Sequence, residues 1–582
     1  MKVKAGGKAL IIAAIIGGCV IAANHFGYFE SRTTTAATVP TKLEIPSGES
    51  PPVGTSTVNL PPANSNYQVK VLTMAWNTFI GLAYANGGVT TASGSIMAKH
   101  GVNVIAERQD DYSAMTAQQV AFAKSFAGGN PNPSEGAAFV VIMGGGFPAY
   151  AAATNEAMAK LGQSVQVIGS IGYSRGEDKC MLPAKVKANP QLARGSLIGG
   201  VERDDDLHLC FKWAKDNSIP INADHTTYDP DAMNFIAVDA FTQADEKLIA
   251  GYSETRPVVH NGKLTGEKAT VMQNGTATWT PGDVKVTTEC AKPGKQCAGI
   301  TAVASSAQYK FMIPAVVIGN KAWMEKNPAL VQNFLAAAFE GGEIVRTDDT
   351  ALLAGASVES KIFKEEAPAY WAKYFKGENG LGGSTTSGLG DNAHLFGLNG
   401  NDSIYKRVYT VLGNLDHEYY PASMPSPLPY SSVVNTSYIE ALLSKSTNTV
   451  KADTGTFVAS APVTGTFARK AYGIEFQSGK STFTPEAATV LDDVLNQIST
   501  TGLYVQVNGH TDNIGNPQSN LALSKARADA VKGWIMQNSP ANFPDARIKA
   551  RGYGDGVPIA DNKTAAGKSK NRRVEILLLE TN

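Results

Sequence analysis

The chain has 582 residues, of which 43% are apolar, and its formal net charge is zero. A chain of this length is expected to form several domains, each with its own hydrophobic core. The zero net charge gives no reason to expect nucleic acid or an anionic surface as a partner.

The N-terminus predicts a membrane anchor. After a lysine-rich leader, the run Ala9–Phe29 contains no acid and no permanent base, and it is long enough to cross a bilayer as one helix. The preceding lysines favour a cytoplasmic N-terminus. We therefore expect residues 1–30 to be a leader and a single-pass inner-membrane helix, with the bulk of the chain in the periplasm. The alternative is a lipoprotein, because Ile16–Cys19 resembles a cleavage box that would leave Cys19 acylated.

Residues 31–66 are rich in Thr, Pro, Ser and Gly, which predicts a flexible linker. Residues 67–420 then alternate apolar runs with helical patterns. The runs typical of buried parallel strands are Val69–Met74, Phe139–Met143, Val165–Ile168, Phe235–Val238 and Ala315–Ile318. One helix is predicted after the acidic turn Asp204–Asp206, and another from Asn327-Pro328 to a stop at Gly341-Gly342. This pattern predicts an open α/β sheet in two lobes, with ligands bound beyond the carboxyl ends of the strands.

The order of features in this region carries a resemblance. An early strand ends in Trp76-Asn77-Thr78, a second lobe opens near Arg194–Gly200, and the chain returns through Ile313–Asn320. This order resembles the substrate-binding proteins of ABC importers, broadly the nitrate/taurine-like group. The resemblance implies a two-lobed periplasmic domain that binds an unknown small solute, with an ABC permease as a candidate partner.

Candidate solute-binding side chains follow the apparent strands or lie in polar loops, where binding residues are often found. They are Trp76, Asn77, Asp110, Asp111, Tyr173, Ser174, Arg175, Trp279 and Asp283. Gly144-Gly145-Gly146 also follows a buried run, but it lacks the lysine and serine of a phosphate-binding loop. We interpret it as close backbone packing or hinge space.

Residues 421–469 are predicted to be a second linker, rich in Ser, Thr and Pro, with one short helix around Tyr438–Ser444. A small α+β domain follows over residues 470–582. Its predicted elements are a strand at Tyr472–Phe476, a helix after Thr484-Pro485-Glu486, a strand through Leu503, Val505 and Val507, a helix after Pro517, and a closing strand through Val574, Ile576 and Leu578.

Four motifs occur in order in this last domain. They are Gly509-His510-Thr511-Asp512, Asn520-x-x-Leu523-Ser524-x-x-Arg527-Ala528, Arg551-Gly552-Tyr553-Gly554, and Asn562-x-Thr564-x-x-Gly567-x-x-x-Asn571-Arg572-Arg573-Val574-Glu575. Together they resemble the OmpA C-terminal family. The resemblance implies peptidoglycan binding, often through the diaminopimelate side chain. One departure is Lys568, where the family often has arginine.

Asp512 and Arg527 are the strongest candidate pair. A guanidinium binds a carboxylate bidentately and a carboxylate binds an ammonium, so the two match the zwitterionic end of diaminopimelate. The alternative is that they pair with each other and brace the fold. Further candidates for binding the peptide or glycan are Thr511, Asn520, Asn562, Thr564 and Arg572, although Asn562 and Thr564 suit capping and turn roles equally well. His510 is expected to be a structural hydrogen-bonding residue and not a metal ligand.

The cysteines suggest an oxidising compartment. Cys290 and Cys297 flank a turn that could close a small disulfide loop, and Cys180 and Cys210 could form a second pair. Two reduced pairs are the alternative.

No catalytic motif is present: the sequence lacks a Gly-x-Ser-x-Gly elbow, a His-Glu-x-x-His run and a usable cysteine–histidine pair. We expect no enzyme activity, no cofactor and no metal. The leading interpretation is a membrane-anchored envelope protein that binds a solute and peptidoglycan. The alternative is a structural tether from membrane to wall, whose central domain binds a protein or nothing. A stator-like proton channel is excluded, because Ala9–Ala23 has no ionisable group.

Overall fold

The computed structural model describes residues 54–222, 224–377, 383–398, 400, 402–452 and 457–581. The predicted membrane run Ala9–Phe29, Cys19 and most of the linker 31–66 lie outside these ranges. Within them, no helix has both the length and the apolar character needed to cross a membrane.

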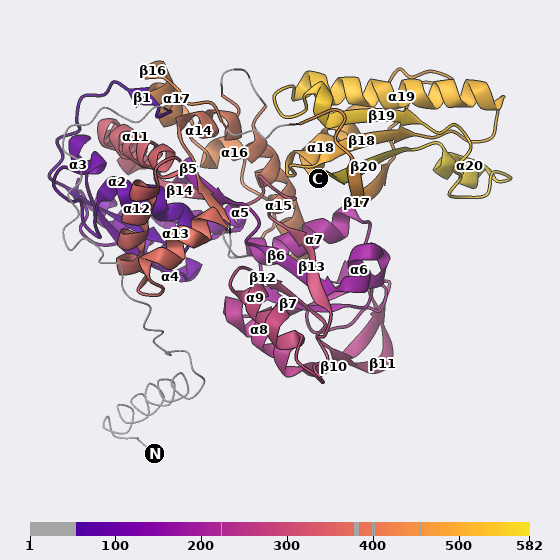
Figure 1. Ribbon diagram of the computed structural model, residues 1–582, viewed down its shortest axis with the longest axis horizontal. Helices are drawn as coiled ribbons and strands as arrows, with labels where there is room; N and C mark the ends of the chain where they lie inside the picture. Colours follow the sequence, from indigo (N-terminus) through magenta and orange to yellow (C-terminus); the bar gives the residue numbers. More distant parts are fainter. Residues whose placement is uncertain are drawn as a thin grey trace. The chain divides into compact units, whose positions relative to one another are not determined.

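The first lobe is built on a six-stranded sheet in the order β15-β5-β14-β4-β2-β3 (Figure 1). Its strands are β2 (Gln68–Thr73), β3 (Asn103–Arg108), β4 (Phe139–Met143), β5 (Val165–Ser174), β14 (Pro314–Asn320) and β15 (Ser384–Thr386). The helices of this part of the chain are η1 (Asn77–Phe79), α2 (Ile80–Asn86), α3 (Ile96–Lys99), α4 (Tyr112–Ala127), α5 (Phe147–Met158), η2 (Ala159–Leu161), α10 (Lys321–Lys326), α11 (Pro328–Val345), α12 (Asp349–Phe363), α13 (Pro368–Lys376), α14 (Leu389–Leu395), α15 (Ile404–Tyr419), α16 (Tyr430–Val433) and α17 (Ser437–Ser444). Strand β4 is fully buried, which accounts for its unbroken apolar run.

The second lobe, magenta in Figure 1, has a six-stranded sheet in the order β13-β6-β12-β7-β9-β8. Its strands are β6 (Lys179–Pro183), β7 (Leu197–Val201), β8 (Ile221–Asn222), β9 (Met233–Val238), β12 (Gly275–Thr278) and β13 (Ile300–Ser305), with a separate hairpin of β10 (Ser253–His260) and β11 (Lys263–Met272). Its helices are α6 (Ala184–Ala188), η3 (Pro190–Ala193), α7 (Asp205–Asp216), α8 (Phe241–Ala250) and α9 (Gly282–Cys290). Helix α7 begins where the acidic turn predicted it, because the Asp204 side chain accepts a hydrogen bond from the Asp206 amide.

Strand direction differs from the prediction at one strand. Strands β2, β3 and β4 are parallel as expected, but β14 runs antiparallel to both β4 and β5. The reason is the course of the chain: β5 leaves the first lobe at the end of the sheet where β14 returns from the second lobe. An apolar run shows that a strand is buried but does not show its direction.

Gly341-Gly342 does not end α11, which continues through both residues to Val345. These glycines instead allow α11 to pack closely on α2. A Cβ atom at Gly341 would lie 2.3 Å from the carbonyl oxygen of Gly81, and one at Gly81 would lie 2.6 Å from the Cα of Gly342. The glycine pair therefore marks a helix–helix contact.

The predicted linker 421–469 is more ordered than expected. The short helix predicted around Tyr438–Ser444 is present as α17, and its Tyr438, Ile439 and Leu442 side chains are buried. Helix α16 and the short strand β16 (Ser446–Asn448), which pairs with β1 (Thr57–Val58), were not predicted. The pairing of β1 also places the end of the first predicted linker in ordered structure.

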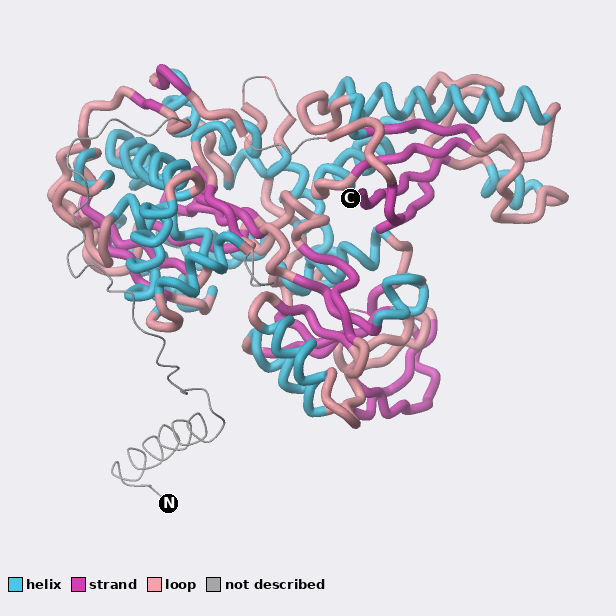
Figure 2. The backbone as a smooth tube through the Cα atoms, in the orientation of Figure 1, coloured by secondary structure: helices cyan, strands magenta, loops and turns pink. Residues whose placement is uncertain are grey.

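The C-terminal domain has a four-stranded sheet in the order β17-β20-β18-β19, with α19 running along it (Figures 1 and 2). Its elements are β17 (Val463–Tyr472), α18 (Ala487–Ser499), β18 (Tyr504–Gly509), α19 (Pro517–Asn538), η5 (Asp545–Arg547), β19 (Ile548–Gly552), α20 (Ala565–Asn571) and β20 (Val574–Thr581). The first strand thus ends at Tyr472, where the sequence predicted that it would begin. Antiparallel pairing with β20 fixes its position.

Both predicted disulfides are formed in the structure, Cys180–Cys210 and Cys290–Cys297, each with a Cα separation of 5.1 Å. The first joins β6 to α7, and the second closes the loop after α9.

The contact between α2 and α11 generates a prediction. Gly341→Ala should lower the free energy of unfolding by about 1–3 kcal/mol, because the added Cβ overlaps the backbone of α2. Gly533→Ala is the matched control. Gly533 is exposed in α19 with no atom near the added Cβ, so this change should raise stability by about 0.5–1 kcal/mol. Thermal melts of both variants beside the wild type provide the measurement. Unchanged melting of Gly341→Ala would show that the two helices can separate without loss.

Candidate functional site

The loop after β18, which carries Asp512, and helix α19, which carries Arg527, form a charged corner of the C-terminal domain. Two glycines allow these elements to approach each other. A Cβ at Gly509, the end of β18, would lie 2.0 Å from the carbonyl oxygen of Ser524, and one at Gly552 would lie 2.6 Å from the amide of Lys525. Helix α19 can therefore rest against the ends of β18 and β19. This approach brings the loop after β18 next to the first turns of α19, where Asn520 and Arg527 lie.

Asp512 occupies this loop as an ionised acceptor. Its Oδ1 accepts from the Ile514 amide at 3.0 Å, and its Oδ2 accepts from Nη1 of Arg572 at 2.6 Å. Burial acts to raise the pKa of Asp512, but these hydrogen bonds hold it below its ordinary value. A carboxylate has about four lone-pair positions, so both oxygens can still accept from a ligand.

Arg527 presents a guanidinium fork beside Asp512. Its Nε donates to the carbonyl of Lys480 at 3.1 Å, and the group lies 4.9 Å from the centre of the Phe476 ring. Within the part of the chain that the structure describes, its two Nη groups have no acceptor. Burial lowers the pKa of Arg527, the charge of Arg572 lowers it further, and Asp512 acts in the opposite direction. Arginine nevertheless stays protonated in proteins, so the fork can bind an anion.

Asp512 has a different ion-pair partner from the one that the bracing alternative assumed. It pairs with Arg572, whose side chain is 46% exposed, and not with Arg527. Asn520 donates to the Asp512 carbonyl at 3.3 Å, and the buried Thr511 hydroxyl has no hydrogen-bond partner among the described residues. Thus five of the seven predicted residues gather at one corner: Thr511, Asp512, Asn520, Arg527 and Arg572.

A second candidate site is a cavity of about 390 Å³ between the two lobes. Its walls carry aromatic rings and acids from both lobes, with a single base among the described lining residues. The rings are Trp76, Trp279, Trp371 and Tyr374, the acids are Asp110, Glu177, Asp178 and Glu365, and the base is Arg108. A larger hollow of about 860 Å³ adjoins it and shares Arg108, Asp110 and Ala240.

The predicted cleft residues divide into two groups. Trp76, Asn77, Asp110 and Trp279 line the cavity, and Asp111 lines the adjoining hollow. Four others line neither space: Tyr173, Ser174, Arg175 and Asp283. Ser174 instead lies 2.6 Å from the Ser306 hydroxyl, Arg175 donates to the Phe375 carbonyl, and Asp283 accepts from Lys179 at 2.5 Å. Tyr173 lines a separate small cavity.

Sequence reasoning missed several cleft residues. Arg108 ends β3 two residues before Asp110, and Trp371 and Tyr374 belong to the aromatic run of α13. A strand-end base and an aromatic-rich helix are signals that could have singled them out. Glu177 and Asp178 follow β5 and gave no such signal, since isolated acids in a turn are common.

The carboxyl group of Glu177 is buried in the cavity wall and accepts hydrogen bonds from two other side chains of the protein. It accepts from Trp76 Nε1 at 2.6 Å and from the Ser384 hydroxyl at 2.9 Å. Burial, and then the charge of Asp178, raise the pKa of Glu177 to about 8. The Arg108 guanidinium does not neutralise the charge of Asp178, because it pairs with Asp110 at 2.7 Å and with Glu365 at 2.6 Å.

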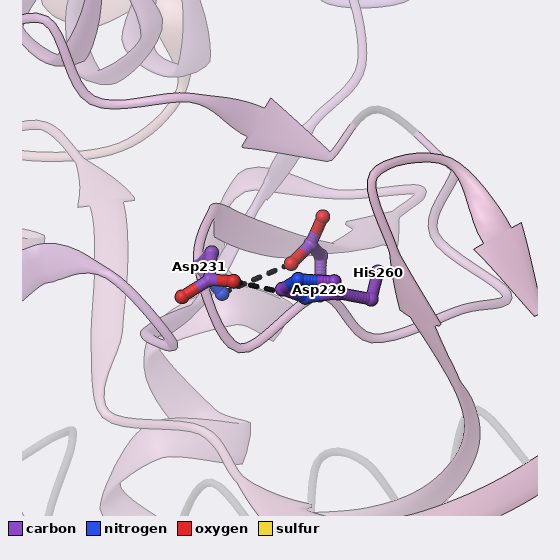
Figure 3. Close-up of side chains that lie close together, drawn as sticks. All are labelled: Asp229, Asp231 and His260. Carbon is purple, nitrogen blue, oxygen red and sulfur yellow. Dashed lines mark hydrogen bonds and ion pairs between the residues drawn. The ribbon is translucent and has the colours of Figure 1, made fainter. Parts of the chain in front are cut away.

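A third cluster lies on the second lobe. Figure 3 shows Asp229, Asp231 and His260 converging, with their potential ligand atoms within 4.8 Å of one another. Asp231 pairs with Nδ1 of His260 at 3.0 Å, and the Asp231 amide donates to Asp229. These groups satisfy one another at an exposed surface, and nothing beyond their spacing points to an ion.

Comparison with known proteins identifies the C-terminal domain. Residues 475–572 match the OmpA family model. Motility protein B of Bacillus subtilis (strain 168) is 39% identical over 112 residues, which are 18% of this chain and 42% of that protein. The outer-membrane lipoprotein YfiB of Pseudomonas aeruginosa is 46% identical over 74 residues, 13% of this chain and 42% of that protein. The chain thus spans less than half the length of either relative.

Among solved structures, the periplasmic nitrate-binding protein NrtA from Synechocystis PCC 6803 is similar over 66% of this chain and 90% of that chain, with 13% identity and a TM-score of 0.43. At that identity and score the likeness says nothing about what the cleft binds.

The remaining predicted residues of the OmpA-family domain have structural roles. Asn562 accepts from Asn571 at 2.8 Å, and Thr564 caps α20 by accepting from the Gly567 amide at 2.9 Å. His510 stacks on Tyr553, with ring centres 5.2 Å apart. Burial acts to raise the pKa of Glu575, but the His510 ring at 3.5 Å and the hydrogen-bonded guanidinium of Arg573 lower it to about 2.

The raised pKa of Glu177 predicts a pH effect on stability. The folded-state value of about 8 lies above the ordinary value of about 4.3. The folded protein therefore binds this proton more tightly than the unfolded chain does. The resulting contribution to the free energy of unfolding is complete below about pH 4 and is lost as the pH rises to about 8. Glu177→Gln stays neutral throughout. The melting temperature of the wild type should therefore fall relative to that of the variant between about pH 5 and about pH 8. Parallel melting curves would contradict the assignment.

Proposed function

We propose that this chain is a non-catalytic envelope protein that holds peptidoglycan through its OmpA-family domain and captures a small solute between its lobes. The observation that supports wall binding is the free guanidinium fork of Arg527 beside the ionised Asp512. The proposal includes no cofactor and no chemical step. An ABC permease is the candidate recipient of the solute.

The two charges suit one end of diaminopimelate, where an ammonium and a carboxylate share a carbon atom. The ligand carboxylate would bind the Nη groups of Arg527, and the ammonium would bind the remaining lone pairs of Asp512. Arg572, whose side chain is 46% exposed, holds Asp512 in place and can also contact the peptide.

An envelope location supports the same function. One relative is an outer-membrane lipoprotein by name, and the two disulfides of this chain favour an oxidising compartment. We propose that the N-terminal segment attaches the chain to a membrane, either through the apolar run Ala9–Phe29 or through an acylated Cys19. The domains described here would then lie in the periplasm.

Wall binding is tested by substitution at the charged corner. The wild-type chain should sediment with purified diaminopimelate-type peptidoglycan, whereas Asp512→Ala and Arg527→Ala should lose most of that binding. Removing one partner of a charge-assisted contact typically costs about 2–5 kcal/mol, which is at least roughly thirtyfold in affinity. Arg527→Lys should also weaken binding, because it keeps the charge but loses the planar fork.

Lys525→Ala is the matched control, since Lys525 lies on the same helix, exposed and paired with Asp529. Its binding should equal that of the wild type, and circular dichroism should show all variants folded. Wild-type binding by folded Asp512→Ala and Arg527→Ala would falsify this assignment.

Solute capture predicts closure of the two lobes. A ligand that binds only the native state raises the melting temperature by mass action, and domain closure compacts the protein. Small-angle scattering and thermal melts of the chain with amino acids, amines, organic anions and oxyanions should identify at least one compacting solute. If none compacts or stabilises the chain, the structural tether becomes the better account of the central domain.

A further inference from the structure

We propose that the solute held between the lobes is an organic cation, a substituted ammonium bound by aromatic rings and carboxylates. This inference rests on the proposed solute capture and adds the chemical class of the ligand. It comes from the composition of the cavity wall, which offers aromatic rings and carboxyl groups but no free base.

Aromatic rings form a large part of the wall. Trp371 is 3% exposed and packs edge-on against Tyr370 and at a tilt against Tyr374, whose ring centres lie 5.3 and 5.8 Å from its own. Trp76 and Trp279 reach the same cavity, the latter from the second lobe. Cations bind over the faces of such rings, and tryptophan binds them best.

One of these rings is joined to an acid. Trp76 donates its indole proton to Glu177 at 2.6 Å, so an aromatic ring and a carboxyl group lie side by side in the wall. The Ser384 hydroxyl lies within hydrogen-bond distance of both oxygens of the same carboxyl group, at 2.9 Å from Oε1 and 3.0 Å from Oε2. An ammonium beside Glu177 would contact the ring and the carboxylate together, and its charge would offset the cost of ionising this buried acid.

The charge of the wall favours a cation. Four acids and one base line the cavity among the described residues, and the base is fully engaged. Arg108 donates to Asp110 and Glu365, and also to the carbonyl of Phe363. An anionic solute would therefore find no free guanidinium in this wall to bind it.

The size of the cavity suits a small ligand. A cavity of about 390 Å³ lies within the range of small-molecule sites.

The test is binding to the full-length chain in detergent. The ammonium probes are choline, tetramethylammonium and putrescine. The neutral comparison is 3,3-dimethylbutan-1-ol, which has the shape of choline without its charge, and nitrate and methanesulfonate are the anions. We expect calorimetry to show binding of at least one ammonium probe. Its affinity should exceed that of every anion, and choline should bind at least about tenfold more tightly than its neutral counterpart.

Variants assign the binding to the cavity. Glu177→Gln and Trp279→Leu should each weaken ammonium binding by about tenfold or more. Glu246→Gln, at an acid on α8 whose side chain is 59% exposed, is the control and should bind as the wild type does. If Glu177→Gln fails to fold, Trp279→Leu alone decides the assignment.

Two results would overturn the inference in different ways. If an anion or the neutral alcohol binds at least as well as the ammonium probes, solute capture stands and the cationic class is wrong. If no ammonium probe binds the chain, the cationic class is likewise wrong, and the scattering experiment then decides whether any solute is captured. Neither result affects peptidoglycan binding, which is measured separately on the OmpA-family domain's variants.

Discussion

A cluster of buried carboxyl groups at the N-terminus of α7 is the constraint on which the junction of the two lobes depends. Asp204, Asp205 and Asp206 are each at most 3% exposed, and Asp416 of α15 is fully buried beside them. Like charges this close are unstable without compensation. His208 supplies part of it: burial acts to lower its pKa, but Asp416 and Asp205 raise it to about 10, so it stays protonated.

A backbone amide and a retained proton also stabilise this cluster of acids. The Gly145 amide donates to Asp205 at 3.0 Å, and a Cβ at Gly145 would lie 2.0 Å from the same carboxyl group. The glycine run after β4 is therefore close backbone packing, and it joins the first lobe to α7 of the second. Burial, and the charges of Asp178 and Asp204, raise the pKa of Asp206 well above its ordinary value, so it keeps its proton. The acids that line the cavity thus continue into a partly protonated network behind it.

The sequence was most informative where neighbouring residues determine the structure. The strand, turn and helix around Asp512 follow from alternation, turn residues and helical spacing within one short stretch, and the structure has all three. The pairing of Asp512 with Arg572 could not be predicted in this way, because 60 residues separate them and only the folded sheet brings them together. The direction of β14 and the role of Gly341 likewise depend on elements distant in the sequence. In the cleft, Trp76 and Asp110 could be predicted because they follow apparent strands in the sequence. Glu177 is identified only by its burial and its hydrogen-bond partners in the folded protein.

The disulfide Cys180–Cys210 has a consequence for when the cleft forms. Cys180 lies two residues after Asp178, and Cys210 lies on α7 four residues after Asp206, so the bond fastens together two segments that carry acids of this buried network. In a reducing compartment this covalent restraint is absent. Under the proposed export, the bond would form only after the chain has crossed the membrane. The cleft would then gain this restraint outside the compartment that holds the metabolites of the cell interior.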